Sequence, residues 1–187
     1  MKNRINIIVA LVLGIIATSC VKTQLETTYN KQEDQIDQYI TRNSVVSNAE
    51  GGSDTLRVVR NNGSNRIVLK EGVGKELARD GYVSFYYAGY TFSGSVNASN
   101  LFTTNRQETA SESGWDSDEA EYKIYEISLK DTELIPGLKY GLEGVKAGEE
   151  CEILFSAKYG FGNKTLGIIP AKTALLYKIW VVGVTND

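Results

Sequence analysis

Alternating apolar and polar residues, separated by turns rich in glycine and asparagine, predict several β-strands after residue 54. The runs 55–60 and 66–70 are joined by Asn-Asn-Gly-Ser-Asn, which predicts a hairpin. The run 81–92 predicts a longer strand with aromatic residues on both faces, and 122–129 predicts another. Near the C-terminus, two further predicted strands flank a glycine-rich loop that ends in Gly-Ile-Ile-Pro. The pattern therefore favours a domain rich in β-structure.

Helical spacing occurs in two short stretches, and the first precedes the strands. Ile36, Tyr39 and Ile40 recur at helical intervals, which predicts a short amphipathic helix over residues 31–40. Its narrow apolar stripe is compatible with docking on the domain, pairing with a second copy, or spacing the domain from a membrane. The residues 43–54 that follow are rich in Ser, Asn and Gly and predict a linker.

The second helical stretch begins near Ile135, where Pro136 suits a first helical turn. Leu138, Leu142 and Val145 lie on one face of this helix, and neighbouring glycines keep it short. We therefore predict an α+β fold. It consists of a curved antiparallel sheet wrapped around one short helix and preceded by the short N-terminal helix.

Residues 93–119 are polar and acidic, interrupted by Leu101-Phe102 and Trp115, and predict a long surface excursion. Trp115 is interpreted as a loop anchor or a ligand contact, whereas Trp180 is interpreted as a core residue. The acidic residues in and after the excursion lack the ligand spacing and mid-loop glycine of an EF-hand calcium loop, so a solvated acidic loop is preferred. These acidic residues are Glu112, Asp116, Asp118, Glu119 and Glu121.

The N-terminal segment has the charge order of a secretory signal. Two basic residues precede the apolar run 7–17, which is short for a membrane span. The sequence Ala-Thr-Ser-Cys at 17–20 resembles the lipobox of bacterial lipoproteins, in which the signal is cut before a cysteine that carries lipid. The resemblance implies lipidation of Cys20 and anchoring to a bacterial membrane, facing the periplasm or the cell surface. The alternative is a plain signal anchor with an incidental cysteine. The expected parts are a signal peptide over 1–19, a tether with a short helix and linker over 20–53, and a folded domain over 54–187.

Composition excludes several classes of active site. The chain has no histidine and two distant cysteines, so it can form neither a Ser-His-Asp or Cys-His centre nor a zinc site built on these residues. Its formal net charge of −3 gives no electrostatic case for nucleic acid. Cys151 alternates with Ile153 and Phe155 and is interpreted as a buried apolar residue. We expect no metal and no cofactor. The apolar and aromatic stretch 133–184 indicates a binding pocket rather than acid–base chemistry.

Six short motifs follow one another between residues 81 and 184. They are Tyr-Tyr-Ala-Gly at 86–89, Leu-Phe at 101–102, Leu-Ile-Pro-Gly-Leu at 134–138, Val-Lys-Ala-Gly-Glu at 145–149, Tyr-Gly-Phe-Gly at 159–162 and Gly-Ile-Ile-Pro at 167–170. In this order they resemble the FKBP-type peptidyl-prolyl cis-trans isomerases. The resemblance implies an FKBP-like sheet wrapped around one short helix, with an apolar pocket between them.

The resemblance also implies which residues form that pocket. Those that match catalytic positions are Tyr87, Phe102, Ile135, Phe161, Ile169 and Tyr177. Those that match other substrate-binding positions are Thr103, Tyr125, Leu134, Leu138 and Ile168. The backbone N–H of Ile135 matches the family's donor to a ligand carbonyl. The implied activity is isomerisation of X-Pro bonds. The expected partners are proline-containing peptides or unfolded exported proteins, and a membrane through the lipid anchor.

Three positions depart from the family pattern. Phe161 replaces a tyrosine, Thr103 replaces an aspartate and Leu138 replaces a tryptophan. Because of these three departures, two functions other than catalysis stay open. One is a non-catalytic FKBP-like module that binds a peptide or protein at the same pocket. The other is a structural lipoprotein whose pocket is filled by its own loop, with Trp115 inside.

Overall fold

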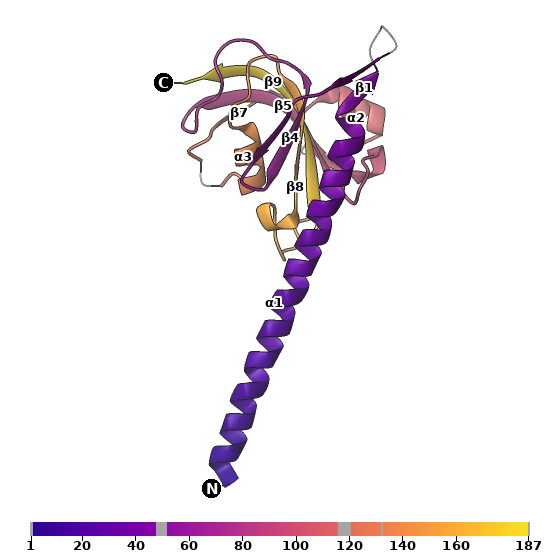
Figure 1. Cartoon of the computed structure of the whole chain (residues 1–187). Helices are drawn as coiled ribbons and strands as arrows, with labels where there is room; N and C mark the ends of the chain where they lie inside the picture. The colour runs from indigo at the N-terminus through magenta and orange to yellow at the C-terminus, as the bar shows by residue number, and fades with distance from the viewer. Residues whose placement is uncertain (1, 48–51, 116–120, 132, 187) are drawn as a thin grey trace.

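The structure, a computed structural model, describes residues 2–47, 52–115, 121–131 and 133–186 (Figure 1). Its helices are α1 (Lys2–Asn43), η1 (Ala98–Asn100), α2 (Gln107–Ser113), α3 (Pro136–Leu142) and η2 (Ala157–Tyr159). Its strands are β1 (Val45–Ser47), β2 (Ser53–Thr55), β3 (Val58–Asn61), β4 (Ser64–Lys70), β5 (Tyr82–Phe92), β6 (Leu101–Thr104), β7 (Tyr125–Ser128), β8 (Glu150–Phe155) and β9 (Ala174–Thr185). The predicted α+β fold, an antiparallel sheet with a short helix against it, is confirmed.

Strands β3 to β9 form one seven-stranded antiparallel sheet in the order β3-β4-β8-β9-β5-β6, and β7 also pairs with β5. The long strands β5 and β9 pair along the whole of β5, from Tyr82 opposite Thr185 to Phe92 opposite Ala174. On its other edge, β5 pairs with β7 in its first half and with β6 in its second half. The middle of β5, around Tyr87, therefore lies between two short strands.

Helix α3 packs against one face of the sheet and completes the main core (Figure 1). Leu138, Leu142 and Val145 are all buried there, as their spacing predicts. Gly137 and Gly141 face β8 so closely that a Cβ on either would lie 2.2 Å from a β8 side-chain carbon. Glycine at these two positions allows the helix to approach the sheet that closely.

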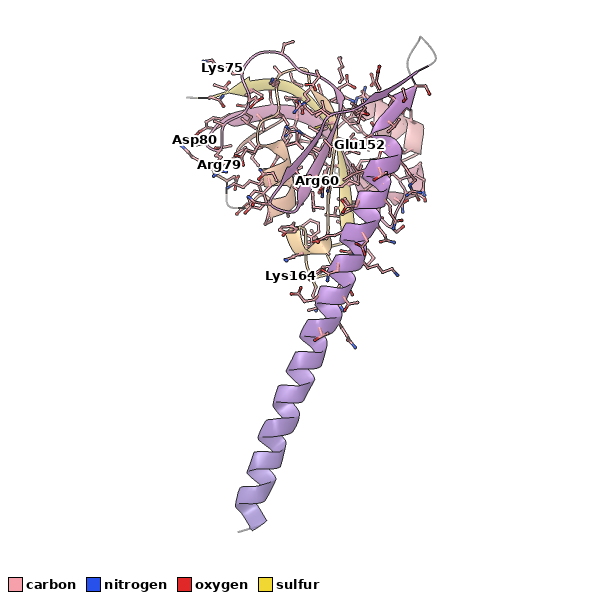
Figure 2. The ribbon with its side chains drawn as sticks, viewed as in Figure 1. Arg60, Lys75, Arg79, Asp80, Glu152 and Lys164 are labelled. Carbon is pink, nitrogen blue, oxygen red and sulfur yellow. The ribbon has the colours of Figure 1, made fainter. Side chains whose placement is uncertain are left out.

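Helix α1 lies against the opposite face of the sheet (Figure 2). Ile36 and Ile40 are buried in an apolar cluster on that face, with exposures of 1% and 4%. Between them, the Tyr39 hydroxyl donates a hydrogen bond of 2.9 Å to the Glu152 carboxylate on β8. Of the three roles open to this apolar stripe, the structure therefore shows docking on the domain. No helix among the described residues meets the length and hydropathy needed to cross a membrane.

Several predicted boundaries are wrong. The N-terminal helix extends far beyond the predicted residues 31–40. Part of the predicted linker 43–54 forms the antiparallel pair β1–β2. The excursion 93–119 is not simply a loop, because it contains β6, which pairs with β5, and helix α2. The predicted strand 122–129 is shorter and corresponds to β7.

The structure also shows the positions of Cys151, Trp180 and two of the acidic residues in and after the excursion. Cys151 is 1% exposed, which confirms its interpretation as a buried residue. Trp180 packs against the α1-facing cluster and is half-buried, with the guanidinium of Arg106 4.3 Å from its ring centre. Of the acidic residues in and after the excursion, the two that the structure describes are exposed. These are Glu112 and Glu121. Asp116, Asp118 and Glu119 lie outside the described residues.

Candidate functional site

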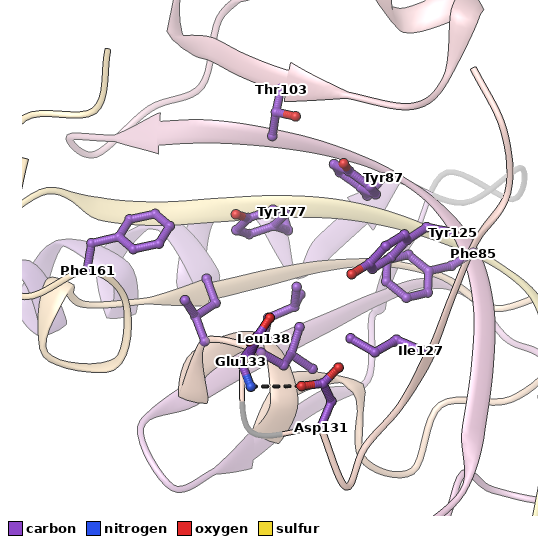
Figure 3. Close-up of a pocket in the computed structure, with 12 residues that line it drawn as sticks. Phe85, Tyr87, Thr103, Tyr125, Ile127, Asp131, Glu133, Leu138, Phe161 and Tyr177 are labelled. Carbon is purple, nitrogen blue, oxygen red and sulfur yellow. Dashed lines mark hydrogen bonds between the residues drawn. The ribbon is translucent and has the colours of Figure 1, made fainter. Parts of the chain in front are cut away.

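A pocket of about 380 Å³ opens between α3 and the sheet (Figure 3). Aromatic and aliphatic side chains form most of its wall, and the polar groups among them are the hydroxyls of one threonine and three tyrosines and two carboxylates. The lining residues are Phe85, Tyr87, Thr103, Tyr125, Ile127, Asp131, Glu133, Leu134, Ile135, Leu138, Phe161 and Tyr177. A concave, mostly apolar pocket with few polar groups is the usual form of a small-ligand or peptide site.

The sheet side of the pocket is a cluster of aromatic rings in edge-to-face and tilted contact. The Tyr87 ring centre lies 6.0 Å from that of Tyr125 and 6.4 Å from that of Tyr177. The ring of Phe102 meets Tyr177 edge-on at 5.9 Å. Gly89 lies below these rings, and a Cβ there would be 2.8 Å from Phe102 and 3.0 Å from Tyr177. The absence of a side chain at Gly89 therefore lets β5, β6 and β9 bring their rings together.

The helix side of the pocket is formed by the start of α3. Ile135 immediately precedes the helix in an extended conformation, and its carbonyl accepts hydrogen bonds from the N–H groups of Leu138 and Lys139, both at 3.1 Å. Leu138 contributes an apolar surface and is 7% exposed. Among the described residues, no carbonyl accepts a hydrogen bond from the Ile135 N–H. Its use as a donor to a ligand carbonyl, which the sequence resemblance implies, stays a prediction.

Asn105 fixes the middle of β5, where Tyr87 lies between β6 and β7. Its side-chain oxygen accepts the Tyr87 N–H at 2.6 Å, and its side-chain nitrogen donates to the carbonyls of Lys123 at 2.7 Å and Phe85 at 3.3 Å. The Thr104 hydroxyl also donates to the Tyr87 carbonyl at 2.7 Å. Asn105 is buried, so these bonds replace the ladder bonds that neither short strand supplies at this point.

Two pocket tyrosines are held in their neutral form. Burial raises the pKa of the Tyr177 hydroxyl well above its ordinary value, and the nearby Tyr87 adds to this. The pKa of Tyr125 is also raised, first by burial and then by Tyr87, Asp131 and Glu133. Among the described residues, no group of histidine, cysteine, aspartate and glutamate side chains could hold a metal ion. The arrangement is suited to non-covalent recognition of an apolar group.

The family model for the FKBP-type peptidyl-prolyl cis-trans isomerase matches residues 74–182. The chain belongs to this family. The match includes every described residue that lines the pocket, from Phe85 to Tyr177. A search of curated proteins found no match.

Solved structures of FKBP-type proteins share the fold at low sequence identity. The peptidyl-prolyl isomerase of Pseudomonas syringae pv. tomato matches with a TM-score of 0.55 and 16% identity, over 86% of this chain and 96% of that one. FkpA of Escherichia coli gives a TM-score of 0.52 and 16% identity, over 93% of this chain and 68% of that one. A multi-domain immunophilin of Arabidopsis thaliana gives a TM-score of 0.55 and 19% identity, over 71% of this chain and 47% of that one. At these identities, the likeness is one of fold.

The structure of the FKBP domain brings most of the predicted site residues together. Those that line the pocket are Tyr87, Thr103, Tyr125, Leu134, Ile135, Leu138, Phe161 and Tyr177. Phe102 lies beside them, in contact with Tyr177, and lines the neighbouring cavity. Ile169 is 4% exposed and belongs to the main core, Ile168 is 74% exposed, and neither is among the described residues that line the pocket. The individual functions of these residues stay predictions.

Four lining residues were not predicted. Phe85 and Ile127 lie two residues from Tyr87 and Tyr125 on the same strands, so the period of two could have identified both. Asp131 and Glu133 precede α3, and the Glu133 N–H donates to the Asp131 carboxylate at 2.8 Å (Figure 3). No sequence pattern distinguishes them from other acidic loop residues.

A second cavity of about 430 Å³ adjoins the pocket of the FKBP domain and shares Tyr87, Thr103 and Tyr125 with it. Trp115 lines this second cavity and does not line the main pocket. The backbone N–H of Trp115 donates to the Ala110 carbonyl at 3.0 Å, which anchors this residue to α2. The alternative in which Trp115 fills the main pocket is therefore wrong.

Proposed function

We propose that the chain is a peptidyl-prolyl cis-trans isomerase that acts on X-Pro bonds of exported proteins. The observation that carries the proposal is the aromatic pocket above α3, which belongs to an FKBP-type domain and whose described lining residues include no nucleophile–base pair. We further propose that lipid on Cys20 holds the chain at a bacterial envelope, facing the periplasm or the cell surface. The lipobox-like sequence at 17–20 supports this location.

The chemistry of the pocket suits rotation about an amide bond. Amide resonance gives the X-Pro bond a rotational barrier of roughly 18–20 kcal/mol, and the planar amide is more charge-separated than the twisted one. A dry apolar pocket therefore disfavours the planar ground state relative to the twisted transition state. The rings of Tyr87, Phe161 and Tyr177 would enclose the proline, and the Ile135 N–H would bind a peptide carbonyl. No proton has to be transferred in this mechanism.

The test is an isomerase assay on residues 20–187 with Cys20→Ser, which removes the signal segment and the lipid but keeps the docked helix. A protease-free assay should be run on a panel of X-Pro peptides. Accelerated isomerisation is expected for at least one peptide. An absence of acceleration with every peptide would sink the proposed activity.

The replacement Phe161→Tyr should raise isomerase activity by up to about tenfold. It restores at the pocket wall a hydroxyl that can donate to a bound peptide, and a neutral hydrogen bond contributes about 0.5–1.5 kcal/mol. The value of kcat/KM measures the effect, and Tyr159→Phe is the matched control on the same loop. Equal activities of wild type and Phe161→Tyr would show that the peptide backbone does not pass this ring.

Isomerase activity should be constant from about pH 6 to pH 9, because Tyr125 and Tyr177 keep their protons there and the proposed mechanism transfers none. The raised pKa values of Tyr125 and Tyr177 keep both hydroxyls neutral above the ordinary tyrosine value of about 10. Any stability from these raised pKa values is complete below that ordinary value and is lost only as the pH rises through the folded-state pKa. A bell-shaped profile of kcat/KM centred near pH 7 would contradict a mechanism without proton transfer.

A second candidate function is peptide binding without catalysis. Phe161 offers no hydroxyl, Thr103 offers no carboxylate, and Leu138 supplies a smaller surface than the family's tryptophan. NMR titration with a proline-containing peptide distinguishes the two functions. Shifts at Tyr87 and Ile135 without any acceleration of isomerisation would favour the binding module.

A further inference from the structure

Gln32 of α1 makes polar contacts with two loops of the FKBP domain. Its side chain is 9% exposed, and both of its polar atoms are bonded to backbone. The Nε2 group donates to the Lys172 carbonyl at 2.6 Å, and Oε1 accepts the Ala157 N–H at 2.9 Å. A donor on one side and an acceptor on the other determine the orientation of this amide.

The two loops that Gln32 contacts are also bonded to each other next to Phe161. The Ala157 carbonyl accepts the Gly162 N–H at 2.8 Å, and the Gly162 carbonyl accepts the Lys172 N–H at 2.8 Å. With the two bonds of Gln32, these contacts form a closed ring of four hydrogen bonds. Phe161, which precedes Gly162, lines the pocket. One side chain of α1 is therefore part of the support of a pocket wall.

The backbone at Lys172 requires such support. Its φ angle is 60°, in the left-handed region that a residue with a side chain adopts at a cost of about 1 kcal/mol or more. Backbone in that region persists where neighbouring contacts determine it. The bonds of the Lys172 N–H to Gly162 and of its carbonyl to Gln32 supply those contacts on both sides of the residue.

Helix docking itself does not depend on Gln32. Ile36 and Ile40 are buried against the opposite face of the sheet from the pocket, and Tyr39 is bonded to Glu152. Helix α1 contacts η2 before it reaches this face, and Gln32 lies one helical turn before Ile36. The apolar contacts can therefore hold α1 in place when the Gln32 amide is replaced.

We propose that Gln32 is a positioning residue of the pocket, through which α1 sets the place of Phe161. The part of the proposal that concerns peptide affinity rests on the proposed binding of proline-containing peptides at this pocket. The consequence is that α1 and the FKBP domain act as one unit in ligand recognition. Removal of α1 should then alter the pocket, although none of the described lining residues comes from α1.

The test compares Gln32→Leu with Gln38→Leu, a change at an exposed glutamine of the same helix. Both are made in residues 20–187 with Cys20→Ser, and NMR records the amide signals of Gly162 and Lys172 and the ring signals of Phe161 and Tyr125. Gln32→Leu should move the signals of Gly162, Lys172 and Phe161 and leave Tyr125, on the far wall, unchanged. Gln38→Leu should move none of them.

A peptide arm measures the consequence for the site. The tetrapeptide Ala-Leu-Pro-Phe should bind Gln32→Leu about three- to tenfold more weakly than wild type and bind Gln38→Leu equally well. If the leucine variant does not fold, Gln32→Glu replaces it in the test. This change keeps the acceptor for the Ala157 N–H but loses the donor to the Lys172 carbonyl, so the amide signal of Lys172 should move more than that of Ala157.

Unmoved Phe161 and Gly162 signals would overturn the positioning of Phe161 by Gln32. Moved signals with unchanged peptide affinity would overturn its influence on recognition. If wild type binds no peptide, the proposed function fails, and the ring and amide signals still decide whether Gln32 positions the wall.

Discussion

Replacing Glu149 with alanine should lower the free energy of unfolding by about 3–5 kcal/mol. The Glu149 carboxylate is fully buried and lies 3.1 Å from the guanidinium of Arg66, which is 2% exposed. A second guanidinium, that of Arg57, lies 3.5 Å away and is partly exposed. Removal of the carboxylate leaves the Arg66 charge buried without its partner, and this accounts for most of the expected loss.

Arg66 also ties the sheet to the helix below the pocket. Its guanidinium donates to the carbonyls of Gly141 at 2.6 Å and Glu143 at 2.8 Å, at the C-terminal end of α3. A cation at this end of a helix is favoured by the helix dipole. Loss of Glu149 should therefore loosen α3 in addition to lowering the stability of the sheet.

Burial of the Arg66–Glu149 ion pair costs desolvation free energy, although loss of one partner is destabilising. Among the described residues, the contact between Arg66 Nε and the Glu149 oxygens lacks hydrogen-bond geometry. Burial raises the pKa of the Glu149 carboxyl, although Arg66 and Arg57 act in the opposite direction. A raised folded-state pKa means that proton binding stabilises the fold, and that this contribution is lost as the pH rises through that value. The double variant Arg66→Met/Glu149→Leu removes both buried charges, whereas Glu149→Ala leaves that of Arg66 without its partner. The double variant should therefore be more stable than Glu149→Ala.

Urea unfolding followed by tryptophan fluorescence measures these differences. Glu150→Ala is the matched control. Glu150 is the next residue along the chain, and its carboxylate forms an exposed ion pair with Lys70 at 3.0 Å. Such a pair contributes about 0–1 kcal/mol, so the control should stay close to wild type. A loss below 1 kcal/mol for Glu149→Ala would show that the carboxylate is not needed to balance Arg66.

The parts of the fold that local patterns determine were predicted correctly. The many aromatic residues of β5 predict this strand, and Pro136 with the apolar spacing after it predicts α3. The strand β6 was missed because its four residues lie within a polar segment and are stabilised by pairing with β5. The docked part of α1 was predicted as a helix, but the local pattern could not choose docking among its three possible roles, since contacts such as that between Gln32 and Lys172 join residues 140 positions apart.

The candidate site was predicted where motifs surround each residue, and missed where only the fold brings residues together. Tyr87, Phe161 and Tyr177 have motif neighbours in the sequence and line the pocket. The four bonds of Asn105 reach β5 and the residue Lys123 before β7, and no spacing in the sequence indicates them. The short sequence Ile168-Ile169 carries a motif, yet only the tertiary structure shows that one residue is buried and the other exposed.

Gly137→Ala should destabilise the domain by about 1–3 kcal/mol and weaken peptide binding. An alanine Cβ would lie 2.2 Å from the Phe155 ring, so the helix or the ring has to move. The ring has little room, because Phe155 is fully buried and stacks on Tyr177 with an interplanar angle of 16°. The helix is therefore expected to move away from the sheet, and this strain exceeds the 0.5–1 kcal/mol that alanine gains over glycine in a helix.

Movement of α3 changes the pocket because the helix and the sheet form opposite walls. Ile135 and Leu138 lie on the helix side, and Tyr177 lies on the sheet side. Gly137→Ala should therefore separate the Ile135 N–H from the aromatic wall and raise the Kd for Ala-Leu-Pro-Phe more than Lys139→Ala, a change on the outer side of the same helix. Addition of Phe155→Leu makes room for the new methyl group and should restore part of the lost affinity. Unchanged urea stability and unchanged Kd in Gly137→Ala would show that α3 can carry a side chain at this contact without moving.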